Sequence, residues 1–342
     1  MGKIKPRYLL LMKKKFYYLL TAIWLVSIQA CSAQQSITKF KTLNYLYSIS
    51  GKKVISGIHN REPNADPGHW TERIKQTTGT YPGLWSGDFL FQKDNIDNRG
   101  IMINEAIKRW KQGFLINIMW HACNPANTQP CGWDDGRGVL SNLSDVQWKE
   151  LVTDGTALNK RWKQMMDEVA AHLQKLEDNG VEVLFRPLHE MNQGKFWWGG
   201  RPGAEGTAKL FRITHDYLVK TKGLGNLIWV WDIQDFPTLE DDVKGYNPGD
   251  EYWDIAALDV YDRSGFTAEK YLIMQSIPGG KPIAIGECDK LPSAQQLEAQ
   301  SKYTFFMGWS ELVFSNNTTD EIKGLYKAPN VLTLGEMPGW LK

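Results

Sequence analysis

Eight short apolar segments, each followed by a longer stretch of mixed polarity, constrain the fold of this chain more than any other feature. Because the segments are apolar almost throughout, we expect strands that are buried on both faces, which is typical of parallel sheets. Alternation of such strands with helices predicts right-handed βαβ units, and a count of eight favours a closed (β/α)8 barrel, the TIM barrel of the α/β class. The predicted strands span residues 54–58, 81–89, 113–121, 181–190, 226–232, 253–262, 282–287 and 303–310.

The stretches between these segments have the spacing of amphipathic helices. The fifth crossover, residues 233–251, is the least helical because it holds Pro237, Pro248 and Gly249. No linker, repeat or charge run divides the chain after residue 40, so we expect residues 32–342 to form a single domain. Helices are predicted near residues 67–78, 99–111, 144–178, 204–222, 266–276, 293–301 and 318–328.

Residues 1–31 are predicted to be a secretory signal. Residues 1–15 hold six basic and no acidic side chains, and an apolar run follows over residues 16–30. A run of about 15 apolar residues after a basic start is typical of a signal peptide and short for a membrane span. The run ends in Ile-Gln-Ala-Cys31, which resembles a bacterial lipobox with an acylated cysteine; cleavage after Ala33 is the alternative. We therefore expect an exported protein, either a lipoprotein anchored to a membrane or a periplasmic or secreted protein.

Charge and hydropathy exclude several classes of protein. The chain has 40 Lys and Arg against 38 Asp and Glu, with 23% charged residues and a mean hydropathy of −0.41. Without residues 1–31, 34 basic and 38 acidic residues remain, a formal charge of −4. This balance gives no basic field for a nucleic acid, and the charged content excludes a polytopic membrane protein. We expect a monomer that binds a neutral partner.

Three cysteines follow the predicted signal. Cys123 and Cys131 flank seven residues, so a local disulfide is expected in an oxidising compartment, whereas Cys288 is expected as a single buried thiol. The cysteine spacing matches no zinc motif, and the three histidines considered as metal ligands fall on separate predicted elements or beside a glutamate. The chain also lacks glycine-rich phosphate loops and the GxSxG motif. We therefore expect neither a metal nor a cofactor.

Polar and aromatic side chains gather where the predicted strands end. In a (β/α)8 barrel this edge carries the active site. Glu190 and Glu287 end the fourth and seventh strands, so they are predicted to face each other across the barrel mouth as the two carboxylates of a retaining glycosidase. Salt-bridged structural glutamates are the alternative. The full set of strand-end residues is Asp88, His121, Glu190, Asp232, Asp259, Tyr261, Asp262, Glu287 and Trp309.

The segment RPLHEMNQGKFWWGGRPG, residues 186–203, resembles the signature of glycoside hydrolase family 26, a β-mannanase family of the retaining (β/α)8 clan. Shorter strand-end segments resemble the same family in order, and the likeness extends over about residues 40–340. It implies Glu190 as the acid/base, Glu287 as the nucleophile, and no cofactor. The shorter segments are SGIHN (56–60), GLWSGDF (83–89), MWH (119–121), DVYD (259–262) and IGE (285–287).

The resemblance also implies roles for neighbouring residues. His189 is expected to bind sugar hydroxyls near the reacting ring, and Tyr261 to donate a hydrogen bond to Glu287. His121 matches a sugar-binding histidine of the family, while Asp259 and Trp309 match positions that line subsites. Many members carry Trp five residues after the acid/base, where this chain has Lys195. An aromatic platform beside the cleavage point is therefore missing, and Lys195 is expected to be solvated.

The tryptophans of this chain are divided between packing and sugar binding. Trp stacks on the apolar face of a pyranose while its indole N–H stays available for a hydrogen bond. We expect one of Trp197 and Trp198 to contact sugar and the other to pack in the core. Trp120, Trp133 and Trp309 are the other candidates for the cleft.

The sequence leaves two possible roles for Asp88 and predicts a supporting role for Arg186. Asp88 is expected either to bind a sugar hydroxyl or to cap a helix. Arg186 is expected beneath the catalytic carboxylates as their charge partner.

These observations predict an endo-acting β-1,4-mannanase that cleaves galactomannan or glucomannan by double displacement. Within the family, the alternatives are a mannobiose-releasing exo-acting enzyme, a xylanase and a mixed-linkage β-glucanase. The alternative from another class is a non-catalytic glycan-binding lipoprotein. The presence of both Glu190 and Glu287 argues against that last reading.

Overall fold

The computed structural model describes residues 38–277 and 279–341, so the predicted signal over residues 1–31 lies outside the described residues. Eight parallel strands follow one another in chain order around a closed ring, because β1 pairs with both β2 and β8. The predicted (β/α)8 barrel is confirmed. The strands are β1 (Val54–His59), β2 (Leu84–Asp88), β3 (Leu115–Trp120), β4 (Val183–Pro187), β5 (Leu227–Gln234), β6 (Ile255–Val260), β7 (Ile283–Cys288) and β8 (Tyr303–Gly308).

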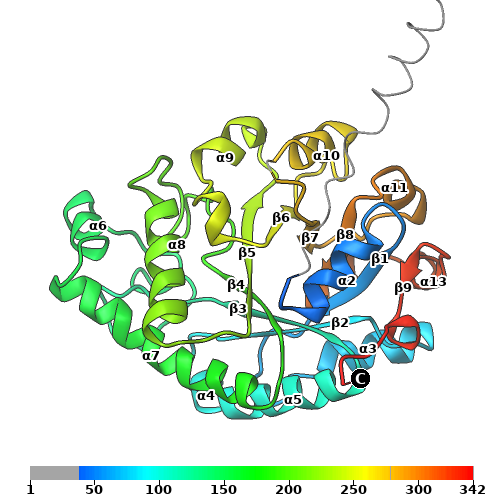
Figure 1. The fold of residues 1–342 in the computed structure, drawn as a ribbon, viewed down its shortest axis with the longest axis horizontal. Coiled ribbons are helices and arrows are strands. Elements are labelled where there is room, and N and C mark those ends of the chain that lie inside the picture. Colours follow the sequence, from blue (N-terminus) through cyan, green and yellow to red (C-terminus); the bar gives the residue numbers. More distant parts are fainter. Residues whose placement is uncertain (1–37, 278, 342) are drawn as a thin grey trace, which may run out of the picture. The chain divides into compact units, whose positions relative to one another are not determined.

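Helices surround this ring, as Figure 1 shows. No helix in the described part of the chain is both long enough and apolar enough to cross a membrane. The α-helices are α2 (Lys41–Ile49), α3 (His69–Thr78), α4 (Lys93–Asp97), α5 (Arg99–Gln112), α6 (Asp145–Leu151), α7 (Ala157–Asp178), α8 (Thr207–Asp216), α9 (Leu239–Gly245), α10 (Ala268–Gln275), α11 (Ala294–Ala299), α12 (Ser310–Asn316) and α13 (Thr319–Tyr326). A π-helical turn (Tyr217–Thr221) extends α8, and short 3-10 turns occupy Asp250–Tyr252 and Leu334–Glu336.

The strands are buried almost throughout, which explains their unbroken apolar character. One segment predicted as a single helix, residues 144–178, is instead two helices. Gly155, in the link between α6 and α7, has a φ of +78°, a conformation that side chains rarely adopt. Thr156 then caps α7, because its side chain accepts a hydrogen bond from the amide of Asn159.

Both ends of the described chain lie at the end of the barrel where the strands begin. Glu182, just before β4, accepts hydrogen bonds from the amides of Lys41 and Thr42 at 2.9 and 2.8 Å and so holds the start of α2. The indole N–H of Trp340 donates to the carbonyl oxygen of Phe114, just before β3, at 2.7 Å. A two-residue strand, β9 (Val331–Leu332), pairs with the start of β1 at the same end.

The expected local disulfide is present. Cys123 and Cys131 are bonded in the loop that follows β3. Cys288 is a free thiol with no exposed surface, as predicted. The disulfide therefore closes a loop at the end of the barrel where the strands finish.

Candidate active site

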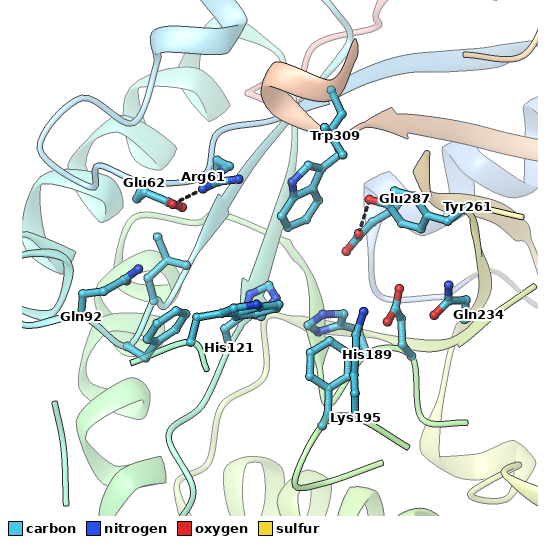
Figure 2. A pocket seen from close by; sticks show the side chains of 16 residues that line it. Arg61, Glu62, Gln92, His121, His189, Lys195, Gln234, Tyr261, Glu287 and Trp309 are labelled. Carbon is cyan, nitrogen blue, oxygen red and sulfur yellow. Dashed lines mark hydrogen bonds and ion pairs between the residues drawn. The ribbon is translucent and has the colours of Figure 1, made fainter. Parts of the chain in front are cut away.

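The carboxyl ends of the strands surround a pocket of about 590 Å³, shown in Figure 2. Glu190 and Glu287 both line it. So do His121, His189, Tyr261 and Trp309 from the predicted set. The remaining lining residues are Arg61, Glu62, Leu90, Phe91, Gln92, Trp133, Lys195, Phe196, Gln234 and Leu312.

The backbone at Glu190 is held in an unusual conformation. Its φ is +47°, in the left-handed region that a residue with a side chain seldom occupies. The neighbouring strand compensates, because the amide of Glu190 donates to Asp232 Oδ1 at 2.9 Å and the amide of Met191 donates to the Asp232 carbonyl at 3.1 Å. Local backbone strain of this kind is typical of functional sites. The turn directs the Glu190 carboxyl group into the pocket, where its Oε2 is buried and has no partner among the described residues.

Glu287 is held by two donors. The Tyr261 hydroxyl donates to Glu287 Oε2 at 2.8 Å, as the family resemblance predicts. Arg186, fully buried below the pocket, donates to Glu287 Oε1. Burial and the neighbouring carboxylates raise the pKa of Tyr261 well above its usual value, so its hydroxyl keeps the proton that it donates. Donors of this kind favour the charged form of a carboxylate.

Arg186 also links the carboxylates beneath the site. Its Nη1 donates to Asp232 at 2.7 Å and to both oxygens of Asp259 at 2.9 and 3.0 Å. Gly286 leaves room for this network, since a Cβ there would lie 2.3 Å from Asp232 Oδ2 and 2.5 Å from Asp259 Oδ1. The predicted role of Arg186 as a charge partner is confirmed. The position just before Glu287 requires glycine because a side chain there would collide with the carboxylates of this network.

The two glutamates are close together but differ in environment. One oxygen from each of Glu190, Asp259 and Glu287 lies within 4.8 Å of the others. Burial, followed by the repulsion of Glu287, raises the pKa of Glu190 to about 8. Glu190 is therefore protonated at neutral pH, whereas Glu287 accepts hydrogen bonds from Arg186 and Tyr261. A protonated carboxyl group about 5 Å from a second carboxyl group that is held by hydrogen-bond donors is the arrangement of a retaining glycosidase.

Among the described residues, the oxygens of these three carboxylates are close enough together to share a metal ion. Both oxygens of Asp259 already accept from Arg186, a permanent cation. The arrangement is suited to an acid and a nucleophile rather than to a metal centre.

A network of histidines forms the floor of the pocket. His121 Nδ1 lies 2.6 Å from Asp88 Oδ2, which orients the ring. Burial raises the pKa of Asp88, but its interactions with His121 and His59 outweigh this and hold the pKa below its usual range. Burial, followed by the proximity of His121, holds the pKa of His189 well below its usual value, so His189 is neutral. The ring of His59 stacks beneath Trp309 with centroids 4.3 Å apart.

Comparison with known proteins is consistent with this geometry. Residues 31–336 match the family model described as Glycosyl hydrolase family 26. The chain belongs to glycoside hydrolase family 26. The solved structure of GH26A from a Muricauda species is 35% identical, with a TM-score of 0.81 and coverage of 89% of this chain and 99% of that one.

Two further proteins are similar over most of this chain. A β-mannanase from a symbiotic protist of the termite Reticulitermes speratus, solved with a gluco-manno-oligosaccharide, is 28% identical over 86% of this chain and 93% of that one, with a TM-score of 0.75. The mannan endo-1,4-β-mannosidase of Thermothelomyces thermophilus is 31% identical over 87% of this chain. The chain spans 61% of the length of that relative.

The structure corrects the expectation that one of Trp197 and Trp198 contacts sugar. Neither lines the pocket, and both are buried. Their indole N–H groups donate to the carbonyl oxygens of Ala122 and His189 at 2.8 and 2.9 Å. Phe196 forms the wall instead, and Trp198 stacks behind it with ring centroids 4.5 Å apart. The aromatic pair therefore supports the wall rather than contacting sugar.

Three further expectations are corrected for a related reason. Trp120 is buried and stacks on Trp162 with centroids 4.7 Å apart, so it is not in the cleft. Asp88 neither caps a helix nor faces the pocket, because it is buried against His121. Asp259 is likewise buried and belongs to the network of Arg186 rather than to a sugar subsite.

Several lining residues were not predicted from the sequence. Gln234 extends β5 two residues past the predicted end at Asp232, and its side chain accepts a hydrogen bond from Gln193 at 2.6 Å. Arg61 pairs with Glu62 beside it and with Glu311 on α12. Arg61 and Glu62 come shortly after the first strand. Their position was a usable signal, because residues that follow the strands of a barrel form its active site. Lys195 is exposed, as expected, but it borders the pocket, where its charge partly offsets the rise in the pKa of Glu190.

Proposed function

We propose that this family 26 protein is a retaining endo-β-1,4-mannanase. The observation that carries the proposal is the pair formed by Glu190 and Glu287, whose carboxyl oxygens lie within 4.8 Å of each other. The pKa of Glu190 is raised to about 8, whereas Glu287 accepts hydrogen bonds from Arg186 and Tyr261. In the first step Glu287 attacks the anomeric carbon and forms an ester bond. The glycosidic C–O bond breaks as the proton of Glu190 passes to the departing oxygen.

In the second step Glu190, now a carboxylate, removes a proton from a water molecule. That water attacks the anomeric carbon and breaks the ester bond to Glu287, which restores both groups and retains the anomeric configuration. Because Arg186 and Tyr261 contact different oxygens of Glu287, one of the two donors stays on the carbonyl oxygen of the ester while the other oxygen bonds to the anomeric carbon.

The substrate assignment is supported by the relatives and by the pocket. The relatives from Thermothelomyces thermophilus and Bacillus subtilis are named mannan endo-1,4-β-mannosidases, and the second is 30% identical over 78% of this chain. The pocket combines the indole of Trp309 with neutral donors and acceptors from His189 and Gln234. An aromatic face beside hydrogen-bonding groups is suited to an uncharged sugar.

A comparison of polysaccharides tests the proposal. We expect reducing sugar from galactomannan and glucomannan, much less from xylan and mixed-linkage glucan, and no loss of rate with a chelator. Short manno-oligosaccharides of mixed length as early products would support endo action, whereas mannobiose alone would favour an exo-acting enzyme. Loss of activity with the chelator would contradict the metal-free mechanism, and failure to cleave any β-glycan would favour a glycan-binding protein.

We further propose that the protein is exported and anchored through acylated Cys31. The support is the basic start, the apolar run and the small residue before this cysteine. We expect the wild type in the membrane fraction of a bacterial host, and Cys31→Ser in the soluble fraction or as an uncleaved precursor. Equal membrane association of the two proteins, with the signal removed from both, would contradict acylation.

A further inference from the structure

Lysines precede three neighbouring strands of the barrel. Lys52 and Lys53 come directly before β1, Lys302 comes directly before β8, and Lys281 comes two residues before β7. These strands are adjacent in the sheet, in the order β7, β8, β1 (Figure 1). Because the strands of a parallel barrel all begin at one end, the four lysines lie at the end opposite the pocket. We call these four residues the lysine face.

The lysine face is continuous across the starts of the three strands. Lys52 and Lys53 line a surface depression of about 410 Å³. A Cβ at the preceding Gly51 would lie 3.4 Å from Lys302 Nζ, so this ammonium group is close to the same turn. Lys302 and Lys281 together line a second depression of about 140 Å³. The four side chains therefore form one surface.

The charges of the lysine face are not neutralised by the protein. Within the described part of the chain, none of its four ammonium groups forms an ion pair with a carboxylate, whereas Lys163 and Lys209 on other faces do. Glu298 is the acidic residue that lines the first depression, and no acidic residue lines the second. The face therefore keeps a net positive charge although residues 32–342 as a whole carry a charge of −4.

The ammonium groups also keep hydrogen-bond donors for a ligand. An ammonium group has three N–H bonds. Lys52 Nζ donates to the Ser48 carbonyl oxygen at 2.9 Å and Lys53 Nζ donates to the Pro329 carbonyl oxygen at 2.5 Å. Lys302 forms hydrogen bonds through its backbone, and its Nζ has no partner among the described residues. Exposed ammonium groups with unused donors are suited to bind phosphate groups.

The start of the described chain lies at the same end of the barrel. Glu182, just before β4, holds the first turn of α2 there. Thr38 comes seven residues after Cys31, the residue proposed above to carry the lipid anchor. Seven extended residues span at most about 25 Å. A membrane that held an acylated Cys31 would therefore stay within a short distance of this end of the barrel.

We propose that the lysine face binds anionic phospholipid headgroups when the protein is anchored through Cys31. The inference rests on the proposed anchoring and not on the identity of the substrate. An anionic membrane attracts this face and repels the remainder of the barrel, whose charge is negative. The pocket, at the opposite end, then points away from the lipid, and a long polysaccharide can enter it.

Lysine acetylation with a water-soluble reagent tests the contact. The acylated protein is reconstituted in vesicles of phosphatidylcholine, with or without an equal part of phosphatidylglycerol, and each lysine is read by mass spectrometry. We expect Lys52, Lys53 and Lys302 to react about fivefold more slowly on the anionic vesicles. Lys149 and Lys160, which are exposed on α6 and α7, should react at equal rates. Equal rates for the lysine face on both kinds of vesicle would contradict the contact.

Salt and two variants separate recognition of charge from simple tethering. About 0.5 M NaCl should remove most of the difference, because the Debye length falls to roughly 4 Å. On anionic vesicles, Lys52→Gln/Lys302→Gln should restore fast acetylation of Lys53, whereas Lys149→Gln/Lys160→Gln should leave it slow. Slow acetylation of Lys53 that persists in salt, or in the first variant, would contradict the proposal. Both variants should hydrolyse soluble mannan like the wild type, since the replaced residues lie outside the pocket.

The mass of the N-terminal peptide distinguishes failure of this inference from failure of the anchoring. Acyl chains on Cys31, together with slow acetylation of the lysine face on anionic vesicles, would support both proposals. A chain without acyl groups would contradict the anchoring and the membrane contact together. An acylated chain whose lysines react at rates independent of lipid charge would contradict the membrane contact alone.

Discussion

Glu287→Ala is expected to lower kcat on mannan by roughly 10⁴- to 10⁶-fold, because removal of the attacking group leaves only binding and the acid. Glu287 is buried and close to Glu190, and it receives hydrogen bonds from Arg186 and Tyr261, as a nucleophile in a retaining site should. Affinity for manno-oligosaccharides should be largely kept, since the other lining residues remain. Initial rates and calorimetry measure the two effects separately.

Chemical rescue provides the decisive readout for this variant. Azide can occupy the space left by the Glu287 carboxylate and attack the anomeric carbon of a substrate with a good leaving group. The product should be the glycosyl azide of inverted, α configuration. Glu269→Ala, which removes an exposed carboxylate from α10, should keep wild-type rates without azide. Near-normal turnover in Glu287→Ala would contradict its assignment as the nucleophile.

Glu190→Ala is expected to lower kcat/KM on mannan by about 10³- to 10⁴-fold, since an unprotonated sugar oxygen is a poor leaving group. The loss should depend on the substrate. With a dinitrophenyl mannobioside, whose leaving group needs no proton, the first step should proceed at close to the wild-type rate and the ester intermediate should accumulate. A burst of dinitrophenol followed by slow turnover would report this accumulation. Equal losses on both substrates would contradict the acid/base role.

The pH profile of the wild type should report the same group. Glu190 must be protonated to act as the acid, and burial, followed by the charge of Glu287, raises its pKa to about 8. The fraction in the active form is therefore high below pH 8 and decreases as the pH rises through this value. We expect kcat/KM on mannan to fall about tenfold per pH unit above 8, because that parameter reports the free enzyme. The dinitrophenyl substrate should lack this alkaline limb in Glu190→Ala.

The barrel and the catalytic pair could be predicted from the sequence because both depend on local pattern. A strand buried on both faces must be apolar, so β3 and β7 are visible as runs. Glu190 and Glu287 stand at the ends of such runs, and parallel strands bring their ends together. The two-residue strand β9 is too short to show such a pattern, and it pairs with the first two residues of β1.

The roles of Asp259, Trp197 and Trp198 depend instead on contacts between distant segments. Asp259 lies 73 residues from Arg186 in sequence, and only the closed barrel brings the two together. The segment that holds Trp197 and Trp198 is an irregular loop without helical or strand periodicity. The local sequence therefore does not indicate which of the two rings is buried. Phe196 faces the pocket because both indoles after it donate to backbone oxygens behind the wall.

The placement of both ends of the described chain beside the starts of β3 and β4 has a practical consequence. Tyr45 on α2 and Trp340 are in ring contact, with centroids 5.7 Å apart, so the first helix and the last residues of the described chain are neighbours. A short linker could join them, and new termini could be opened in a surface loop, without altering the strand order. Coupling to a resin at Thr38 or Leu341, the ends of the described chain, would attach the barrel by the face opposite its substrate mouth. Long polysaccharides would then reach the immobilised catalyst from the open side.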